Sequence, residues 1–236
     1  ETPWIGNEAH KLYLHSGQFS ATLRTSLDIT ALDGANLGME WDGTNTPWGG
    51  NTNMKLFLQS GKFSATVKTS LDISSLDTEL TGVSWDGTDT PWTSEGDSKH
   101  FLNSGQFSIT VKTSFGYTGI APVSTDISYD GTNSPWIGTD DKLHLQSGQF
   151  SATLKTSLDV SGVDGFAAGI SWDGTNTPWC GGYGRKLYLQ SGQFSATLKT
   201  SLDVSGVDTG PSGLSTDDND SRLGVGAAFT PTAVIF

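Results

Sequence analysis

Five tryptophans that each follow a proline are the residues of this sequence best suited to contact a ligand. They are Trp4, Trp48, Trp92, Trp136 and Trp179. Short polar residues precede four of them: Asn45, Asp89, Asn133 and Asn176. An exposed indole beside polar side chains offers a flat apolar surface to one face of a sugar ring, and its N–H adds a hydrogen bond. We predict a ligand-binding site at these nine residues. The alternative is that the indoles form the core between repeats.

A second aromatic set occupies another constant position of the chain. Its members are Trp41, Trp85, Tyr129 and Trp172, with Thr216 at the equivalent position near the C-terminus. Each belongs to a short β-favouring segment that we expect to be an inner strand. The exchange of Trp for Tyr indicates a packed side chain with a polar tip. We therefore expect this set to belong to the core.

The other groups that could carry chemistry favour a structural role. Aspartates recur five residues apart, for example Asp28 with Asp33, a spacing compatible with Ca²⁺ ligands or with Asx turns. The four histidines occupy different repeat positions, and the single Cys180 aligns with Gly, Thr and Ile elsewhere. The aspartates of the Asp-Gly dipeptides are expected to shape tight turns: Asp42, Asp86, Asp130 and Asp173. We predict no catalytic residue, no metal site, no cofactor and no enzyme activity.

Two independent markers show that these residues belong to a tandem repeat. The Pro-Trp dipeptides are 44, 44, 44 and 43 residues apart, and the phrase Ser-Gly-(Gln/Lys)-Phe-Ser keeps step with them from Ser16 to Ser191. The segment from Leu145 to Asp164 reappears unchanged from Leu189 to Asp208. A period of this length is typical of repeat architectures. We predict one domain over residues 1–220, with repeats 1–44, 45–88, 89–132, 133–175 and 176–220, followed by a tail or added strand over 221–236.

The sequence of each repeat predicts four short strands. In the fifth copy these are residues 169–172, 177–179, 186–190 and 194–199, separated by Asp-Gly, Gly-rich and Ser-Gly turns. Four antiparallel strands in about 44 residues match a propeller blade. A single such sheet cannot bury both faces, so neighbouring copies must stack. The sequence therefore predicts an all-β, five-bladed β-propeller with four-stranded antiparallel blades.

Ring closure is expected to join the two terminal segments. The sequence opens at the second strand of copy one, and Gly213 to Thr216 stands in the register of a first strand at the other end. We predict that this segment completes the first blade.

By blade count and blade length, the chain resembles the five-bladed lectins of the tachylectin type. The phrase Gly-Ile-Ser-Trp-Asp-Gly-Thr at Gly169 also resembles the first strand of NHL-like propeller repeats. The Trp-Asp dipeptide lacks the upstream Gly-His of WD40 repeats. The resemblance is architectural and carries over no sugar-binding residue.

The composition limits the classes of partner that we expect. The formal net charge is −12, and no run of apolar residues is long enough to cross a membrane. Phosphate neutralisation needs clustered Lys and Arg, so we expect no nucleic acid partner and no membrane insertion. We expect a monomer, located outside the cell or on a cell or virion surface.

Symmetry suggests the function. Near-equal blades make near-equal clefts, which suit weak binding to a ligand that is itself repeated. We predict a non-catalytic, multivalent carbohydrate-binding propeller with one site per blade and glycans or glycoconjugates as partners. The alternative is a structural or adhesive repeat module of a larger secreted, viral or phage surface protein.

Overall fold

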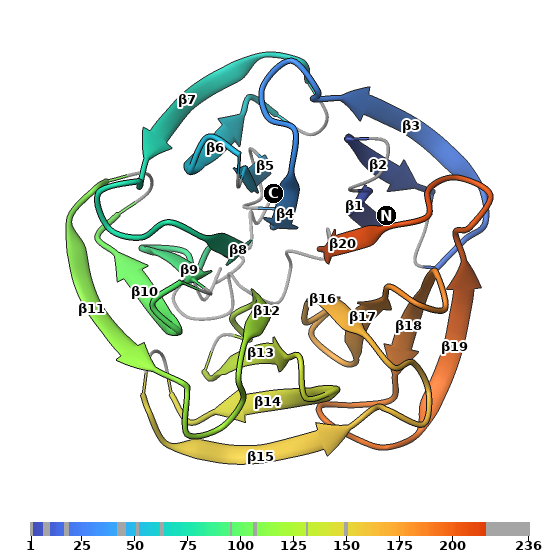
Figure 1. Ribbon diagram of the computed structural model, residues 1–236. Coiled ribbons are helices and arrows are strands. Elements are labelled where there is room, and N and C mark those ends of the chain that lie inside the picture. The colour runs from blue at the N-terminus through green and yellow to red at the C-terminus, as the bar shows by residue number, and fades with distance from the viewer. Residues whose placement is uncertain are drawn as a thin grey trace, which may run out of the picture.

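The structure is a ring of β-sheets. The computed structural model describes residues 2–6, 10–16, 19–41, 46–50, 52–61, 64–94, 96–105, 108–130, 132–148 and 151–215. Over these residues the strands form five four-stranded antiparallel sheets, and no helix is long and apolar enough to span a membrane. The sheets surround a central axis, with one short strand of each nearest the axis and one long strand at the perimeter (Figure 1). The prediction of an all-β propeller is confirmed.

Four strands follow one another from the axis outward in each sheet. Sheet 1 contains β20 (Pro211–Leu214), β1 (Thr2–Gly6), β2 (Lys11–His15) and β3 (Leu23–Asp28). Sheet 2 contains β4 (Asn36–Met39), β5 (Thr46–Gly50), β6 (Lys55–Gln59) and β7 (Val67–Asp72). Sheet 3 contains β8 (Leu80–Val83), β9 (Thr90–Ser94), β10 (Lys99–Asn103) and β11 (Val111–Gly116). Sheet 4 contains β12 (Ser124–Ile127), β13 (Ser134–Gly138), β14 (Lys142–Gln146) and β15 (Leu154–Asp159). Sheet 5 contains β16 (Ala167–Ile170), β17 (Thr177–Gly181), β18 (Lys186–Gln190) and β19 (Leu198–Asp203).

Sheet 1 closes the ring with strands from both ends of the sequence. The inner strand β20 pairs antiparallel with β1, so that Leu214 lies opposite Trp4 and Gly213 opposite Ile5. Closure by the C-terminal segment was predicted, but the strand begins two residues earlier, at Pro211, and ends at Leu214. Thr216 and the tail predicted over residues 221–236 lie outside the described residues.

Two of the four strand predictions are wrong in phase. The third strand is β18 as predicted, and the second extends to Gly181. The first strand, predicted at 169–172, covers residues 167–170. Its pairing with β17 begins at Ala167, contains a register shift between Ala167 and Gly169, and ends at Ile170. The turn that follows therefore begins earlier than the sequence pattern indicates.

The fourth strand begins at Leu198 instead of Phe194. Bonds between loop atoms hold the intervening segment as a turn: the Ser191 N–H donates to the Thr197 carbonyl at 2.8 Å, and Ser195 Oγ accepts the Thr197 N–H at 3.2 Å. Phe194 has a φ of 58°, outside the β region. Local side-chain bonding of this kind competes with strand pairing, so the alternating pattern from Phe194 misplaces the strand.

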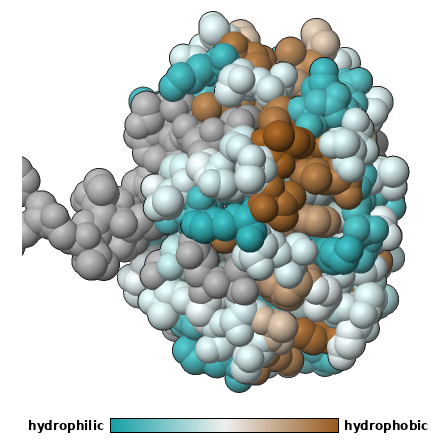
Figure 2. All heavy atoms as spheres, turned by 90° about the vertical axis from the view of Figure 1, so that its left-hand side faces the viewer, coloured by the Kyte–Doolittle hydropathy of each residue, from teal (hydrophilic) through white to brown (hydrophobic). Residues whose placement is uncertain are grey.

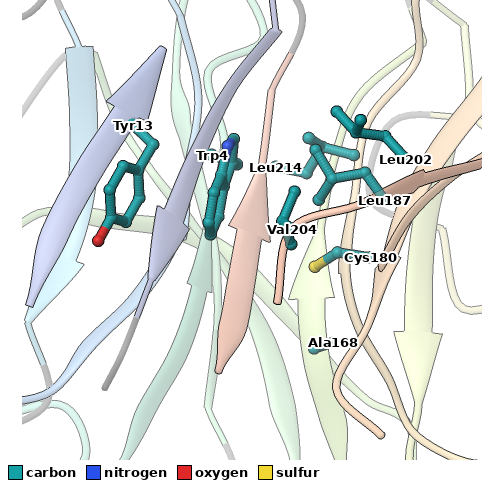
Figure 3. Packing of buried hydrophobic residues seen from close by; sticks show 8 residues of the cluster. All are labelled: Trp4, Tyr13, Ala168, Cys180, Leu187, Leu202, Val204 and Leu214. Carbon is teal, nitrogen blue, oxygen red and sulfur yellow. The ribbon is translucent and has the colours of Figure 1, made fainter. Parts of the chain in front are cut away.

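The hydrophobic core lies between neighbouring sheets. One cluster joins sheet 1 to sheet 5, with Trp4 beside Tyr13 on one side and residues of sheet 5 on the other (Figure 3). Its members are Trp4, Tyr13, Ala168, Cys180, Leu187, Leu202, Val204 and Leu214. Similar clusters join sheet 1 to sheet 2 and sheet 2 to sheet 3. Each sheet therefore depends on its neighbours to bury its faces.

The outer strands are polar and largely exposed. In β11, for example, three consecutive residues are exposed, and one of them is Lys112. On the side of the ring seen in Figure 2, hydrophilic residues and residues of near-neutral hydropathy border a strip of hydrophobic ones. Lysine on an edge strand disfavours pairing with another chain.

Candidate functional site

The five Pro-Trp tryptophans, here called the core tryptophans, are buried. Each has 0% of its surface exposed: Trp4, Trp48, Trp92, Trp136 and Trp179. They stand on the second strand of each sheet, and each ring stacks on the side chain directly opposite on the third strand, as Trp179 does on Tyr188 with ring centroids 4.3 Å apart. A neighbouring sheet covers the other side of the indole. The prediction that these indoles contact a ligand is therefore wrong, and the core alternative holds.

The polar residues predicted beside them fix turns. Asp89, Asn133 and Asn176 are at most 6% exposed. Asn176 Oδ1 accepts the Gly192 N–H at 3.2 Å, and Asp89 Oδ1 accepts the Gly105 N–H at 2.8 Å. Each bond ties the turn before the second strand to the hairpin after the third, so these three side chains position the end of the sheet. Asn45 lies outside the described residues.

Those same turns carry the second aromatic set, here called the rim aromatics. Trp41, Trp85, Tyr129 and Trp172 are each partly exposed. Each lies two residues beyond the end of an inner strand, where the chain leaves the sheet. The expectation that this set is core is wrong for that reason, because a side chain beyond the last strand pair has a neighbouring sheet on only part of its surface. Thr216, the fifth member, lies outside the described residues.

The aspartates next to the rim aromatics shape their turns, as predicted. Asp173 Oδ1 accepts the N–H groups of Thr175 and Asn176 at 2.7 and 2.5 Å, and Asp130 makes the equivalent pair of bonds. In sheet 3, burial raises the pKa of Asp86 despite its bonds to Thr88 and Asp89. Asp42 lies outside the described residues.

Polar groups from two sheets meet beside one rim aromatic. The Gln193 amide of sheet 5 donates to Asp130 Oδ2, which follows Tyr129 in sheet 4. In sheet 3, Lys112 Nζ lies 2.6 Å from Asp89 Oδ2. Burial acts to raise the pKa of Asp89, but Lys112 and the Gly105 amide outweigh it and lower the pKa. This end of the ring thus combines partly exposed aromatics with amide and charged groups.

The opposite end of the axis has a pocket of about 370 Å³. One residue from each inner strand lines it, at five equivalent positions: Leu37, Thr81, Thr125, Ala168 and Ser212. Phe166 and Tyr183 stand on one side of it, 36% and 76% exposed, with ring centroids 5.7 Å apart. We did not predict this pocket. The available signal was Tyr183 within Gly-Gly-Tyr-Gly, where other copies carry residues such as Thr52 and Gly96.

Cys180, His100 and His144, three of the nucleophile and base candidates, are enclosed. Cys180 is fully buried, and burial raises the pKa of its thiol, which keeps it protonated. Burial, with a contribution from His144, lowers the pKa of His100 to about 3. Burial also lowers the pKa of His144, although Asp140 lies 3.0 Å from its Nε2. None of these groups faces the pocket or the rim aromatics.

The two aspartates of a recurring pair lie in different environments. Asp28 Oδ1 accepts the Thr30 N–H at 2.9 Å on the surface, whereas Asp33 is buried and accepts the Ala35 and Asn53 N–H groups at 2.9 Å. These are Asx-type bonds. Within the described part of the chain, no group of three or more His, Cys, Asp or Glu side chains is arranged to hold a metal ion.

Fold and site together define a β-propeller protein with repeated aromatic turns at one end of its ring. Solved structures with similar folds include the Myxococcus xanthus glutaminyl cyclase, with a TM-score of 0.61, 12% identity and coverage of 92% of this chain and 84% of that one. They also include a chain of a nidogen/laminin complex, with a TM-score of 0.59, 12% identity and coverage of 91% and 98%. No protein-family model and no curated protein sequence matches the chain. At this identity the similarity shows the propeller fold.

Proposed function

We propose that the chain is a five-bladed, lectin-like propeller that binds carbohydrate without catalysis, at sites repeated from blade to blade. The observation that carries the proposal is the set of rim aromatics: four partly exposed aromatic side chains at equivalent positions of four sheets, all at one end of the ring. The proposed site thus moves from the core tryptophans to Trp41, Trp85, Tyr129 and Trp172.

The chemistry around the rim aromatics suits a neutral sugar. A partly exposed indole or phenol offers a flat apolar face to a pyranose, and its N–H or O–H is a polar handle. The Gln193 amide and Asp130 carboxylate beside Tyr129 are groups of the kind that bind sugar hydroxyls. Bonds to Asp86, Asp130 and Asp173 fix the turns after Trp85, Tyr129 and Trp172. A turn that is fixed before a ligand arrives lowers the entropic cost of binding.

Repetition supports a multivalent mode of action. Modest affinity at each turn is amplified when several turns engage one glycan-covered surface, because every contact after the first is intramolecular. All rim aromatics lie at the same end of the ring, so one surface can meet them together. The enclosed state of Cys180, His100 and His144 supports a non-catalytic role.

A glycan array with the intact protein tests the proposal. We expect binding to neutral glycans, a stoichiometry of several ligands per chain, and loss of one ligand per chain in Trp172→Ala. The quadruple variant Trp41→Ala/Trp85→Ala/Tyr129→Ala/Trp172→Ala should lose binding and keep its circular dichroism spectrum. Tyr183→Ala is the matched control, because it removes an exposed aromatic at the other end of the ring.

Three outcomes would contradict the proposal. A folded ring that binds no glycan would favour a structural or adhesive module. A single ligand per chain would remove the multivalent mode. Loss of binding in Tyr183→Ala, with the quadruple variant unaffected, would move the site to the axial pocket.

A further inference from the structure

The residue directly after every inner strand lies near the axis of the ring. The five residues are Glu40, Ser84, Ser128, Ser171 and Ser215, each at most 2% exposed. Three of the serines converge on the Glu40 carboxylate: Ser215 Oγ at 2.8 Å, Ser84 Oγ at 3.1 Å and Ser128 Oγ at 3.5 Å. The fourth, Ser171, holds the same position directly after β16, and its Oγ is buried without a hydrogen-bond partner.

A second layer lies two residues earlier on the same strands. Its members are Gly38, Gly82, Asp126, Gly169 and Gly213. The inner strands approach closely here, since a Cβ added to Gly169 would lie 2.8 Å from the Cα of Gly213. A Cβ added to Gly82 would lie 2.5 Å from Asp126 Oδ1. The Asp126 side chain therefore occupies the space that glycine leaves between the strands.

Asp126 is incompletely bonded. It is 1% exposed, and its Oδ2 accepts the Ile170 N–H at 3.0 Å. Its Oδ1 is buried and has no hydrogen-bond partner. Burial raises the pKa of this carboxyl well above its usual range, and the charge of Glu40 raises it further. A buried carboxylate without a compensating charge is costly.

The two carboxylates are independent departures from the repeat. Glu40 replaces the serine of the other four copies, and Asp126 replaces the glycine of the other four. Glu40 directly follows β4 of sheet 2, and Asp126 stands on β12 of sheet 4. The ring brings these two segments together, because the Ser128 hydroxyl, two residues after Asp126, donates to the Glu40 carboxylate. Two unrelated substitutions that place negative charge in the same buried part of the axis indicate a positive occupant.

We propose that the axis of the propeller binds one divalent cation, with Ca²⁺ favoured, between Glu40 and Asp126. The carboxylate of Glu40 and Oδ1 of Asp126 supply the negative charge, and the Ser171 hydroxyl supplies a neutral oxygen. Hard cations take such oxygen ligands, and Ca²⁺ accepts irregular arrangements more readily than Mg²⁺, which retains its waters. This site is independent of the proposed carbohydrate sites.

The axial pocket lies next to the proposed site along the inner strands. The five inner-strand residues that line it, among them Thr81, Thr125 and Ala168, each directly precede a member of the Asp126 layer. No lysine, arginine or histidine lines this pocket. The residues that line the pocket beside Asp126 therefore place no positive side chain there to repel a cation.

Calcium titration of the chelator-treated protein tests the site, by isothermal titration calorimetry and by thermal unfolding with and without Ca²⁺. We expect one Ca²⁺ per chain, weaker binding of Mg²⁺, and a higher melting temperature with Ca²⁺. Glu40→Ser and Asp126→Gly restore the residues of the other copies, so both variants are expected to fold. Each should lower the affinity by about tenfold or more, because affinity depends on the charge of the ligand set. Asp28→Asn, which neutralises an exposed carboxylate, is the matched control and should bind as the parent does.

Either of two results would overturn the proposal. One is the absence of heat and of any shift in melting temperature with Ca²⁺, Mg²⁺ or Mn²⁺. In that case, stabilisation by Asp126→Asn at neutral pH would show that a proton neutralises the site. The other is Ca²⁺ binding that Glu40→Ser and Asp126→Gly leave unchanged, which would place the ion elsewhere.

Discussion

The core tryptophans and the rim aromatics share a period of about 44 residues. They differ in their position relative to the strand ends and in their exposure to solvent. Trp179 stands inside β17, opposite Tyr188, with another sheet packed against it. Trp172 stands two residues past the end of β16 and keeps part of its surface in solvent. An aromatic repeated in every copy thus indicates a repeated environment, and whether that environment is core or surface depends on the strand boundaries.

The core tryptophans should carry most of the stability. Trp179→Ala removes a fully buried indole and its stacking on Tyr188. We expect a loss of about 3–5 kcal/mol in the free energy of unfolding, measured by chemical denaturation. A loss below about 1 kcal/mol would mean that the interface between sheets 4 and 5 does not depend on this side chain.

One core tryptophan has ionisable neighbours, which should make its interface sensitive to acid. His100 packs on Trp136 with ring centroids 5.0 Å apart, and its folded pKa is about 3 against an ordinary value of 6.5. The unfolded chain therefore binds a proton on this imidazole below about pH 6.5 and the folded chain does not. Stability from this group is full above pH 6.5 and falls as the pH drops toward 3.

The size of that effect follows from the linkage between protonation and folding. At pH 5 the loss should be about 2 kcal/mol relative to pH 7. His100→Leu restores the leucine of the other four copies and should flatten this slope, measured by denaturation from pH 7 to pH 4. His144 titrates in the same cluster, so His100→Leu/His144→Phe should flatten it further. A slope that neither variant changes would contradict the assignment.

Hydrogen bonds to the indole N–H distinguish one core tryptophan from another. Trp92 Nε1 donates to Asn103 Oδ1 at 3.1 Å, and the Asn103 amide donates to the Ser108 carbonyl at 2.9 Å. Asn103→Ala should cost about 1–2 kcal/mol, because it leaves a buried donor and acceptor unsatisfied. Gln146, at the same position of sheet 4, makes no such bond among the described residues. Gln146→Ala should therefore cost less, and an equal cost would remove the distinction.

The rim aromatics should contribute least to stability. Trp172→Ala removes a partly exposed side chain beyond the strand end, and we expect a loss of about 1 kcal/mol or less. The measurement is the same denaturation series as for Trp179→Ala. A loss comparable to that of Trp179→Ala would erase the contrast between the two sets and weaken the case for a ligand surface at the rim.

Strand phase explains which parts of the site the sequence could predict. The Asp-Gly turns and the strand Lys186–Gln190 follow from local rules and were predicted correctly. Phe194 was placed in a strand because it alternates with Ala196 and Leu198, yet it lies in a turn held by Ser195 and Gln190 side chains. The same kind of error put Trp172 inside an inner strand. A shift of two residues keeps the periodicity and changes which side chains leave the sheet.

No local sequence pattern predicted which side chains lie near the axis. Glu40 and Asp126 each look like a single deviation in one copy of the repeat, and Tyr183 like an aromatic in a glycine-rich turn. Their places near the axis depend on how the five sheets pack around it, and a local sequence pattern does not contain that information.

By itself, the sequence determined the repeat, the four-stranded sheets and the closure of the ring by its C-terminal segment, because these depend on period, turn chemistry and the need to bury two faces of every sheet. Only the tertiary structure decided that the Pro-Trp indoles are core, that Trp41, Trp85, Tyr129 and Trp172 reach the rim, and that Glu40 and Asp126 are both buried near the axis. The physical reason is that exposure and convergence arise from contacts between sheets that lie far apart in the chain.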